Sequence, residues 1–288
     1  PHAIAKTIGY HNMESITKGL YKVGNGLLPL WTRYTPSSSK KIVRDIFPAE
    51  SADSPMAVYF PSCITRSMGG ASYGYRETDD VPAKMLSLLR KANYTVIIPE
   101  EKDKLCCGMA FSSKGFRKQA RQKETELNEA LLKASRNGEL PILCDMSPCL
   151  LHMRETLDPR LKLYDQVEFI HDFLLDRLQI EKQPISIAIH TTCSSSKMHL
   201  EEKLHKIASL CAETVIVPEN ISCCGWAGDR GFFYPELNNS ALAQLKQGVG
   251  SATEGYSNSR TCEIGLSINS GMAYKSLIYL VDKAAKSI

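Results

Sequence analysis

Two pairs of adjacent cysteines give this chain its clearest capacity for chemistry: Cys106-Cys107-Gly108 and Cys223-Cys224-Gly225. A lone cysteine precedes each pair and another follows it: Cys63 and Cys149 around the first pair, Cys193 and Cys262 around the second. Thiolates in sets of four suit iron–sulfur clusters or zinc. The spacing therefore predicts two metal centres, each built from four cysteines.

The adjacency of the paired cysteines favours iron–sulfur clusters over zinc. Structural zinc sites typically use two cysteines separated by two residues, whereas neighbouring cysteines point in different directions and suit different irons of a cluster. Adjacent cysteines do not easily bridge each other, and disulfide frameworks belong mainly to short secreted chains. Zinc stays open as the alternative metal, and a reducing compartment is expected.

Residues beside the cysteine pairs can tune such centres. Gly108 and Gly225 would let backbone N–H groups approach cluster sulfur atoms. Lys114 and Arg230 each precede a Gly-Phe pair downstream of the cysteines. Their charges either act on the centres or are simply solvated, and the sequence leaves both readings open.

Other candidate residues near the predicted centres have a plain structural reading. Cys211 has no counterpart in the other half and is expected in the core, whereas ligation by Cys144 stays open. His190 stands where the first half has Phe60. We expect it to be a polar residue whose hydrogen bonds are satisfied, and this reading is preferred to a hydrogen bond with a cluster ligand. Trp226 either shields a cluster from water or fills the core.

Each motif cysteine follows a predicted strand, and strands alternate with helices. Nearly the same hexapeptide precedes both cysteine pairs, at 95–100 and 214–219. Further strands are predicted at 56–60, 140–143 and 185–189, with a poorly marked one at 256–261 before Cys262. Helices are predicted at 81–91, 116–135, 166–178, 197–210, 235–247 and 276–285. This alternation predicts an α/β fold of two tandem repeats, each a small, mostly parallel sheet flanked by helices.

Ligands of parallel α/β sheets bind beyond the carboxyl ends of the strands, so loops far apart in sequence can converge there. We therefore expect two sites, one with Cys63, Cys106, Cys107 and Cys149 and the other with Cys193, Cys223, Cys224 and Cys262.

The predicted organisation is a helical leader at 1–52, a first module at 53–182 that includes a bridging helix, and a second module at 183–288. Apolar residues in the leader recur at helical spacing: Met13, Ile16, Leu20, Val23 and Leu27. This pattern predicts an amphipathic helix that packs on an adjacent domain, which is preferred to attachment at a membrane surface.

The composition limits the function classes. Of the 288 residues 43% are hydrophobic and 23% are charged, which is typical of a soluble globular protein. The net charge of +4 gives nucleic-acid binding little support, and no apolar run approaches the ~20 residues of a bilayer span. The chain begins with Pro1, so we expect a fragment or processed product. The cysteines, which we do not expect to form disulfides, predict a place in the reducing cytoplasm, with the inner face of the membrane as an open alternative.

The doubled motif resembles the cysteine-rich CCG domain of the heterodisulfide reductase B subunit and of the iron–sulfur subunits of glycolate oxidase and anaerobic glycerol-3-phosphate dehydrogenase. That signature is a lone Cys, then Cys-Cys-Gly, then Cys-x-x-Cys. Here Met146 and Ser259 replace the first cysteine of the final motif. The resemblance implies up to two clusters, and with four cysteines a [4Fe–4S] cluster is at least as suitable as the five-cysteine cluster of heterodisulfide reductase.

The segments 147–149 and 258–265 look like the carboxyl-terminal part of bacterial FAD-linked D-lactate dehydrogenases. This resemblance implies an electron-transfer module of a flavin-linked 2-hydroxy-acid dehydrogenase. FAD would lie in a separate flavin domain, which with a ferredoxin-like segment would be the partner, so no complete active site is expected in this chain. A cluster-based thiol–disulfide reductase and a zinc–thiolate scaffold are the alternative functions. The hydroxy acid, the electron acceptor and the oligomeric state are left open.

Overall fold

The computed structural model describes residues 1–49 and 53–288, so the predicted end of the leader at residue 52 lies outside the described residues. It confirms the α/β class with two mostly parallel sheets. In the first sheet the strand order is β1-β3-β2-β4-β5, and all neighbours except the β1–β3 pair are parallel. Its strands are β1 (Ile46–Phe47), β2 (Met56–Phe60), β3 (Thr95–Ile97), β4 (Ile142–Cys144) and β5 (Leu163–Asp165).

The second sheet repeats this topology. Its order is β8-β7-β9-β10, which corresponds to β3-β2-β4-β5 of the first sheet, and every pair is parallel. The strands are β7 (Gln183–Ile189), β8 (Ala212–Ile216), β9 (Glu254–Ser257) and β10 (Tyr274–Ser276). Strands β5 and β10 were not predicted, because neither Leu163-Tyr-Asp165 nor Tyr274-Lys-Ser276 forms the apolar run that marks a buried strand.

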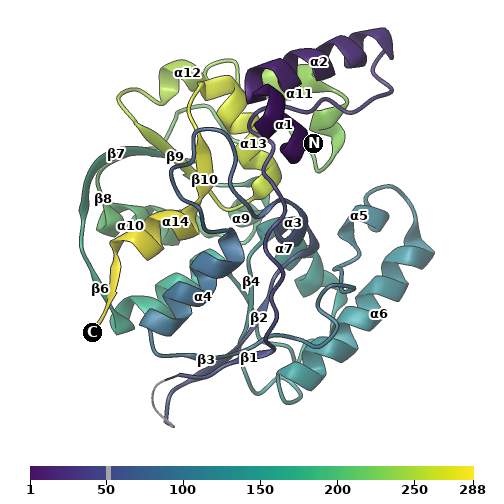
Figure 1. Ribbon diagram of the computed structural model, residues 1–288. Coiled ribbons are helices and arrows are strands. Elements are labelled where there is room, and N and C mark those ends of the chain that lie inside the picture. Colours follow the sequence, from purple (N-terminus) through teal and green to yellow (C-terminus); the bar gives the residue numbers. More distant parts are fainter. Residues whose placement is uncertain (50–52) are drawn as a thin grey trace.

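Helices flank both sheets (Figure 1). Those of the first repeat are α3 (Cys63–Met68), α4 (Val81–Lys91), α5 (Met109–Ser112), α6 (Arg117–Ala134), α7 (Ser147–Thr156) and α8 (Gln166–Phe169). Helix α8 continues as the π-helix η1 (Ile170–Leu174) and the 3₁₀-helix η2 (Leu175–Arg177). Those of the second are α9 (Cys193–Lys197), α10 (Glu201–Cys211), η3 (Arg230–Phe232), α11 (Pro235–Ala241), α12 (Leu245–Gly248), α13 (Arg260–Ser270) and α14 (Leu277–Ala284). The helix predicted at 235–247 is thus two short helices.

The two repeats share one apolar core. Helix α4 of the first repeat packs against α14 of the second (Figure 1). Helix α10 of the second packs against α8 of the first. Leu88 and Leu89 of α4 and Leu277 and Leu280 of α14 are fully buried in this core. Strand β6 (Leu178–Ile180), which follows η2, pairs antiparallel with β11 (Ala285–Ser287), which follows α14. The tandem repeats therefore fold as one interlocked unit.

The leader forms α1 (His2–Ile8) and α2 (Tyr10–Val23), which confirms the predicted helix. Its predicted apolar face does not pack on the described part of the chain, because Ile16, Leu20 and Val23 are exposed there. The opposite face, with buried Glu14, is the one turned inward. No helix in the described ranges is both long enough and apolar enough to cross a bilayer.

Gln166, at the start of α8, joins the two repeats at a buried point. Its side-chain Nε2 donates to the carbonyl of Asp145, at 3.0 Å, and to that of Asn258, at 3.3 Å. These two acceptors follow β4 and β9, which are equivalent strands. The amide therefore satisfies equivalent carbonyls of both sheets at once.

Replacing Gln166 by Ala should lower the free energy of unfolding by about 2 kcal/mol or more, because two buried carbonyls lose their donor. Urea unfolding monitored by circular dichroism measures the change. Gln119→Ala, at an exposed position on α6, is the control and should leave stability unchanged. Equal stability of both variants would contradict a bridging role for Gln166.

Asp165 generates a prediction about pH. Its side chain is fully buried and accepts from the Val167 N–H as the cap of α8, while Oδ2 has no partner. Burial raises the pKa of Asp165 to about 7, against the hydrogen bond from Val167. An unfolded Asp has a pKa of about 3.9, so the folded state holds the proton more tightly and loses stability as pH rises from about 4 to about 7.

Asp165→Asn keeps the cap without the charge, so it should remove this loss. Its stability advantage over the unmodified protein should grow with pH, by at most about 1.4 kcal/mol per unit, and level off above about pH 7. Unfolding midpoints across this range test the idea. Parallel curves for the two proteins would show that Asp165 titrates normally.

Candidate metal centres

The first cysteine of each set opens a short capped helix. Cys63 begins α3, where the Ser62 side chain accepts from the Thr65 N–H at 3.1 Å. Cys193 begins α9, where the Thr192 side chain accepts from the Ser195 N–H at 3.3 Å. Helix α3 follows β2 and α9 follows the equivalent strand β7, which places these sulfurs at the carboxyl edge of each sheet.

The last cysteine of each set lies in the first turn of a longer helix. Cys149 is in α7, after β4, and Cys262 is in α13, after β9. The Cys-Cys-Gly loops follow the neighbouring strands β3 and β8. All three cysteine-bearing segments of a repeat thus start from one edge of its sheet, as the sequence predicted.

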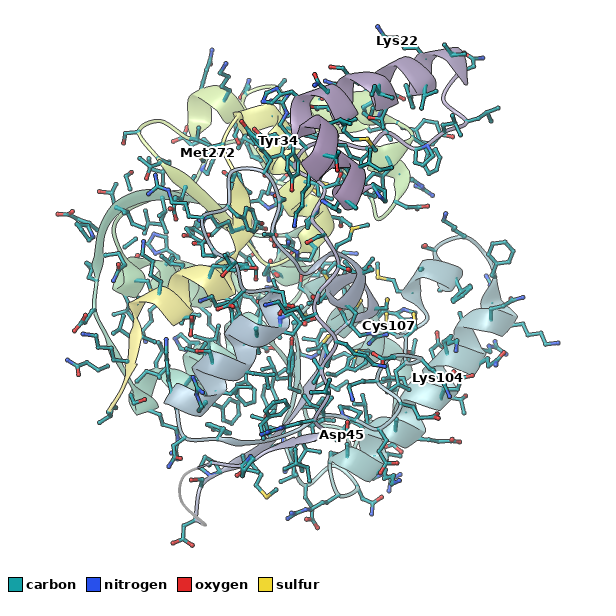
Figure 2. The ribbon with its side chains drawn as sticks, in the orientation of Figure 1. Lys22, Tyr34, Asp45, Lys104, Cys107 and Met272 are labelled. Atoms are coloured by element: carbon teal, nitrogen blue, oxygen red, sulfur yellow. The ribbon has the colours of Figure 1, made fainter. Side chains whose placement is uncertain are left out.

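The sulfurs of each set meet. Cys63 Sγ lies 3.8 Å from Cys106 Sγ, and the Cys107 thiol hydrogen-bonds with Cys106 and Cys149. In the second set Cys224 Sγ lies 2.9 Å from Cys262 Sγ, and the Cys223 side chain hydrogen-bonds with Cys224 and Cys193. All ten cysteines are free thiols. Sulfur atoms gather around the labelled Cys107 in Figure 2.

Within residues 1–49 and 53–288, no three or more His, Cys, Asp or Glu side chains are arranged to hold a single metal ion. The thiols of each set instead contact one another in a row that runs from the first cysteine through the pair to the last. The ligand role of these eight residues stays a prediction.

Backbone N–H groups surround the paired sulfurs in the same way in both repeats. The N–H of Gly108 points to Cys106 and that of Met109 to Cys107. The N–H of Gly225 lies 3.4 Å from Cys223 Sγ, and that of Trp226 points to Cys224. Such donors stabilise negative charge on sulfur, which is the role predicted for the two glycines.

Both glycines have left-handed backbone angles, with φ of 87° at Gly108 and 66° at Gly225. A Cβ at Gly225 would lie 2.6 Å from the Leu237 carbonyl oxygen, and one at Gly108 would lie 2.8 Å from that of Ala120. The close approach to a helix backbone and the positive φ together require glycine.

Arg66 is a charged residue of the first site that the sequence reasoning missed. Its guanidinium donates to the carbonyls of Pro61, at 2.7 Å, and Leu105, at 2.6 Å, which precede Cys63 and Cys106. It thereby ties two cysteine loops together. A clue was available, because Arg66 lies one helical turn after Cys63.

The first site favours a thiolate at Cys106. Hydrogen bonds from the Cys107 and Cys63 thiols, then the Gly108 N–H and the Arg66 charge, lower the pKa of Cys106 to about 2 despite burial. The hydrogen bond to Cys106 and burial raise the pKa of Cys63. Because the thiolate is the form that binds metal, Cys106 is prepared for ligation.

The second site is the more open one. Cys193 and Cys223 are exposed, whereas Cys63 and Cys106 are half-buried. The other two cysteines of each site are buried. Trp226 is buried in the apolar cluster that contains Cys224 and Cys262, so it both fills the core and keeps water from that side of the site.

The basic residues named from sequence lie further out. Lys114 is half-exposed and forms an ion pair with Asp229, and the Arg230 side chain is exposed. The Lys114–Asp229 pair joins the loops that follow the two Cys-Cys-Gly motifs.

The remaining thiols and the histidine are all buried. Cys211 lies in the shared core, as predicted. Cys144 is buried beside Cys107 and Cys149, with its thiol 3.7 Å from the Met146 carbonyl oxygen. His190 is buried, Nε2 has no partner, and burial lowers its pKa to about 4. The prediction that His190 is a satisfied polar residue is therefore wrong for one of its two ring nitrogens.

The two sites adjoin each other across the interface between the repeats. Helix α3, which carries Cys63, packs against α13, which carries Cys262, and α7, with Cys149, packs against α9, with Cys193. At the second contact the Ser147 hydroxyl lies 2.8 Å from that of Thr192 and 2.7 Å from that of Ser194. Each site therefore shares a wall with the other.

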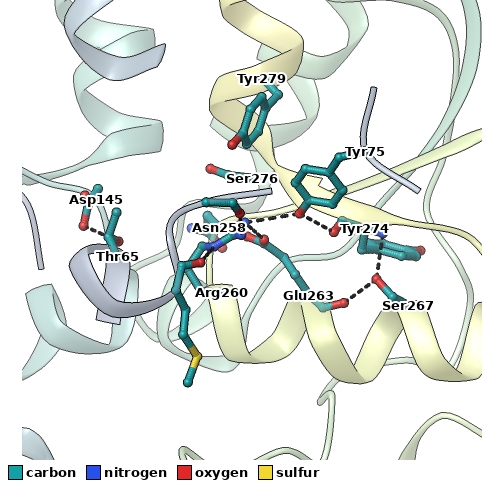
Figure 3. A network of polar contacts seen from close by, with 12 residues as sticks. Thr65, Tyr75, Asp145, Asn258, Arg260, Glu263, Ser267, Tyr274, Ser276 and Tyr279 are labelled. Atoms are coloured by element: carbon teal, nitrogen blue, oxygen red, sulfur yellow. Dashed lines mark hydrogen bonds and ion pairs between the residues drawn. The ribbon is translucent and has the colours of Figure 1, made fainter. Parts of the chain in front are cut away.

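A buried arginine fixes the first contact. Arg260 donates to the carbonyl of Met68, the last residue of α3, at 2.9 Å, and to that of Gly70, just after α3, at 3.1 Å. Figure 3 shows its guanidinium with Glu263 and Tyr75, and the Arg260–Glu263 ion pair is fully buried. These contacts hold the start of α13 against the end of α3.

A protein-family profile matches one segment in each of the two repeats. The family profile described as "CCG: Cysteine-rich domain" matches residues 57–154 and 187–262, which is more than half of the chain. The chain belongs to the CCG cysteine-rich domain family. Each matched CCG segment begins in the first strand of a repeat and includes its four predicted cysteines.

The chain is also similar to part of a curated dehydrogenase subunit. The C subunit of anaerobic glycerol-3-phosphate dehydrogenase, from Escherichia coli K12 and from O157:H7, is 26% identical over 142 residues, which covers 44% of this chain. The alignment spans only 35% of those relatives' own length. An aspartate racemase homologue from Pyrococcus horikoshii OT3 aligns at 10% identity with a TM-score of 0.29, over 79% of this chain and 96% of that one. That score does not establish a common fold.

The CCG glycines allow a matched test. Gly225→Ala should lower the free energy of unfolding by about 2–4 kcal/mol, because it adds a clash with α11 to the cost of a positive φ. Gly228→Ala is the control, since Gly228 has a φ of 77° but a Cβ added there would meet nothing within 4 Å. It should cost only about 1 kcal/mol. Denaturant unfolding that gives equal losses would contradict the close-approach argument.

Proposed function

We propose that each set of four cysteines holds one iron–sulfur cluster and that the chain is the electron-transfer module of a flavin-linked dehydrogenase. The observation that carries this proposal is the duplicated arrangement of four contacting thiols, with backbone N–H groups on both sulfurs of each adjacent pair. Membership of the CCG family supports it.

The donor set fits such a cluster on chemical grounds. Four thiolates are the usual ligands of a [4Fe–4S] cluster, and N–H donors to sulfur adjust its potential. The thiols lie in a row and do not converge on one point, which suits ligands of different irons better than the tetrahedral ligands of one zinc ion. A [4Fe–4S] cluster in each site is therefore the form that we propose.

When bound, the clusters would supply one-electron transfer, and the protein's own residues would hold and tune them. Cys106 and Cys107 would anchor the first cluster under the Gly108 and Met109 amides, with Arg66 adding positive charge. The shared walls between the sites suit the passage of electrons from one to the other. The exposed Cys193 and Cys223 make the second site the better place for exchange with another protein.

The larger reaction would belong to partner domains. We propose that a flavin domain with FAD oxidises a 2-hydroxy acid such as D-lactate and passes electrons to this module through a ferredoxin-like segment. The curated relatives are named as a subunit of a dehydrogenase, which fits an electron-accepting role beside another subunit. Ten free thiols suit the reducing cytoplasm, where we place the module.

Cysteine variants test the assignment. Anaerobically prepared protein should contain iron and acid-labile sulfide, and Cys107→Ser or Cys224→Ser should each remove roughly half of the iron, because each breaks one of two sites. Cys211→Ser is the matched control, since Cys211 is buried in the core away from both sets. Iron and sulfide analysis, with EPR spectra of the reduced protein, gives the readout.

Two outcomes would contradict the proposal. Zinc without iron or sulfide in anaerobic preparations would favour the scaffold alternative. Equal iron loss in Cys211→Ser and Cys224→Ser would show that the cluster ligands are not the cysteines assigned here.

A further inference from the structure

The leader exposes a row of aliphatic side chains that we call the leader stripe: Ile16, Leu20, Val23 and Leu27. Val23 is 88% exposed, Leu27 83%, and Ile16 and Leu20 51% each. Ile4 on α1 is also exposed. Helices α1 and α2 lie at the outer edge of the molecule, over α11 and α13, and Lys22 labels the far end of α2 (Figures 1 and 2).

Contacts on the opposite face of α2, and in the segment that follows it, hold the stripe outward. The Tyr21 hydroxyl donates to the Phe233 carbonyl at 2.6 Å, and the Leu30 N–H donates to the Phe232 carbonyl at 2.7 Å. Glu14 is buried and pairs with Arg33 at 2.5 Å. The helix is therefore docked on the second repeat, and the exposure of the stripe does not come from a detached helix.

The charge around the stripe has one sign. Residues 1–44 contain seven Lys or Arg residues and a single acid, Glu14. That acid is buried and paired with Arg33 and Lys18. Lys18 lies on the Glu14 face of α2, whereas Lys22 near the end of α2 and Lys6 on α1 are exposed and have no acid beside them within residues 1–44. The outer surface of the two helices thus presents aliphatic groups and positive charge without a compensating carboxylate.

We propose that α1 and α2 bind the surface of a bilayer that contains anionic phospholipids. Helix α2 would lie in the plane of the interface, with the leader stripe at the boundary of head groups and acyl chains and the lysines at the phosphates. A basic amphipathic helix is the form that interfacial binding uses.

The composition of the face favours lipid over a protein partner. Protein interfaces are enriched in Tyr, Trp and Arg at their centre and depleted of Lys. The leader stripe is purely aliphatic, and the exposed lysines of the same two helices, Lys6 and Lys22, have long side chains that can reach head groups while their stems stay in the apolar layer. The inference goes beyond electron transfer and does not depend on the clusters.

Vesicle co-sedimentation with the whole chain tests the proposal. The protein should bind vesicles of phosphatidylcholine mixed with phosphatidylglycerol, bind pure phosphatidylcholine much less, and release at high salt because screening weakens the lysine attraction. The double variant Leu20→Glu, Val23→Glu should reduce binding by roughly tenfold or more.

The matched control is Leu210→Glu with Val217→Glu, which makes the same residue and charge changes at exposed positions on the second repeat. It should bind as the unmodified protein does. Circular dichroism checks that all variants are folded, and iron content reports separately on the clusters.

Three outcomes would overturn the proposal. The first is no binding to anionic vesicles, and the second is equal loss in the two double variants. The third is a dimer, seen by light scattering, that Leu20→Glu with Val23→Glu dissociates while vesicles capture nothing, because the stripe would then bind a second copy of the chain.

Discussion

The structure depends on the packing of each repeat's helices on the other repeat. Helices α4 and α14, and α10 and α8, bury their apolar faces in one core that neither sheet could form alone. That core sets how the two sheets face each other, so it also sets which cysteine-bearing helices meet. The contacts of α3 with α13 and of α7 with α9 follow from it, and they bring the two candidate centres together across the interface.

Equivalent positions in the two repeats carry different chemistry. Asp145 after β4 is a buried carboxylate that accepts from Tyr59, Ser62 and Thr65, whereas Asn258 after β9 donates to Ser195. His190 replaces Phe60, and the second site is the more exposed. A duplicated scaffold thus holds two centres with distinct surroundings, and two clusters in such sites would differ in reduction potential.

The sequence predicted what local pattern and repetition can reveal. The repeated cysteines, most of the strands before them and helices such as 81–91 were clear from the sequence, whereas the strand before Cys262 was poorly marked. The structure brings the eight sulfurs together as two sets. Arg66 and Gln166 were missed because their partners are chosen by tertiary packing, as with Gln166 and the Asn258 carbonyl 92 residues away. The direction of the leader stripe was misjudged because helical spacing shows that one face is apolar, but not which face is buried.

The pairing of β6 with β11 has a consequence for symmetry. Both strands follow the last helix of their own repeat, and they run antiparallel, with Leu178 opposite Ser287 and Ile180 opposite Ala285. Equivalent elements that pair with each other define an isologous contact, which is the kind that relates the subunits of a two-fold dimer. Two separate copies of one repeat could make the same contact, and the tandem chain fixes it within a single molecule, where the halves are free to diverge.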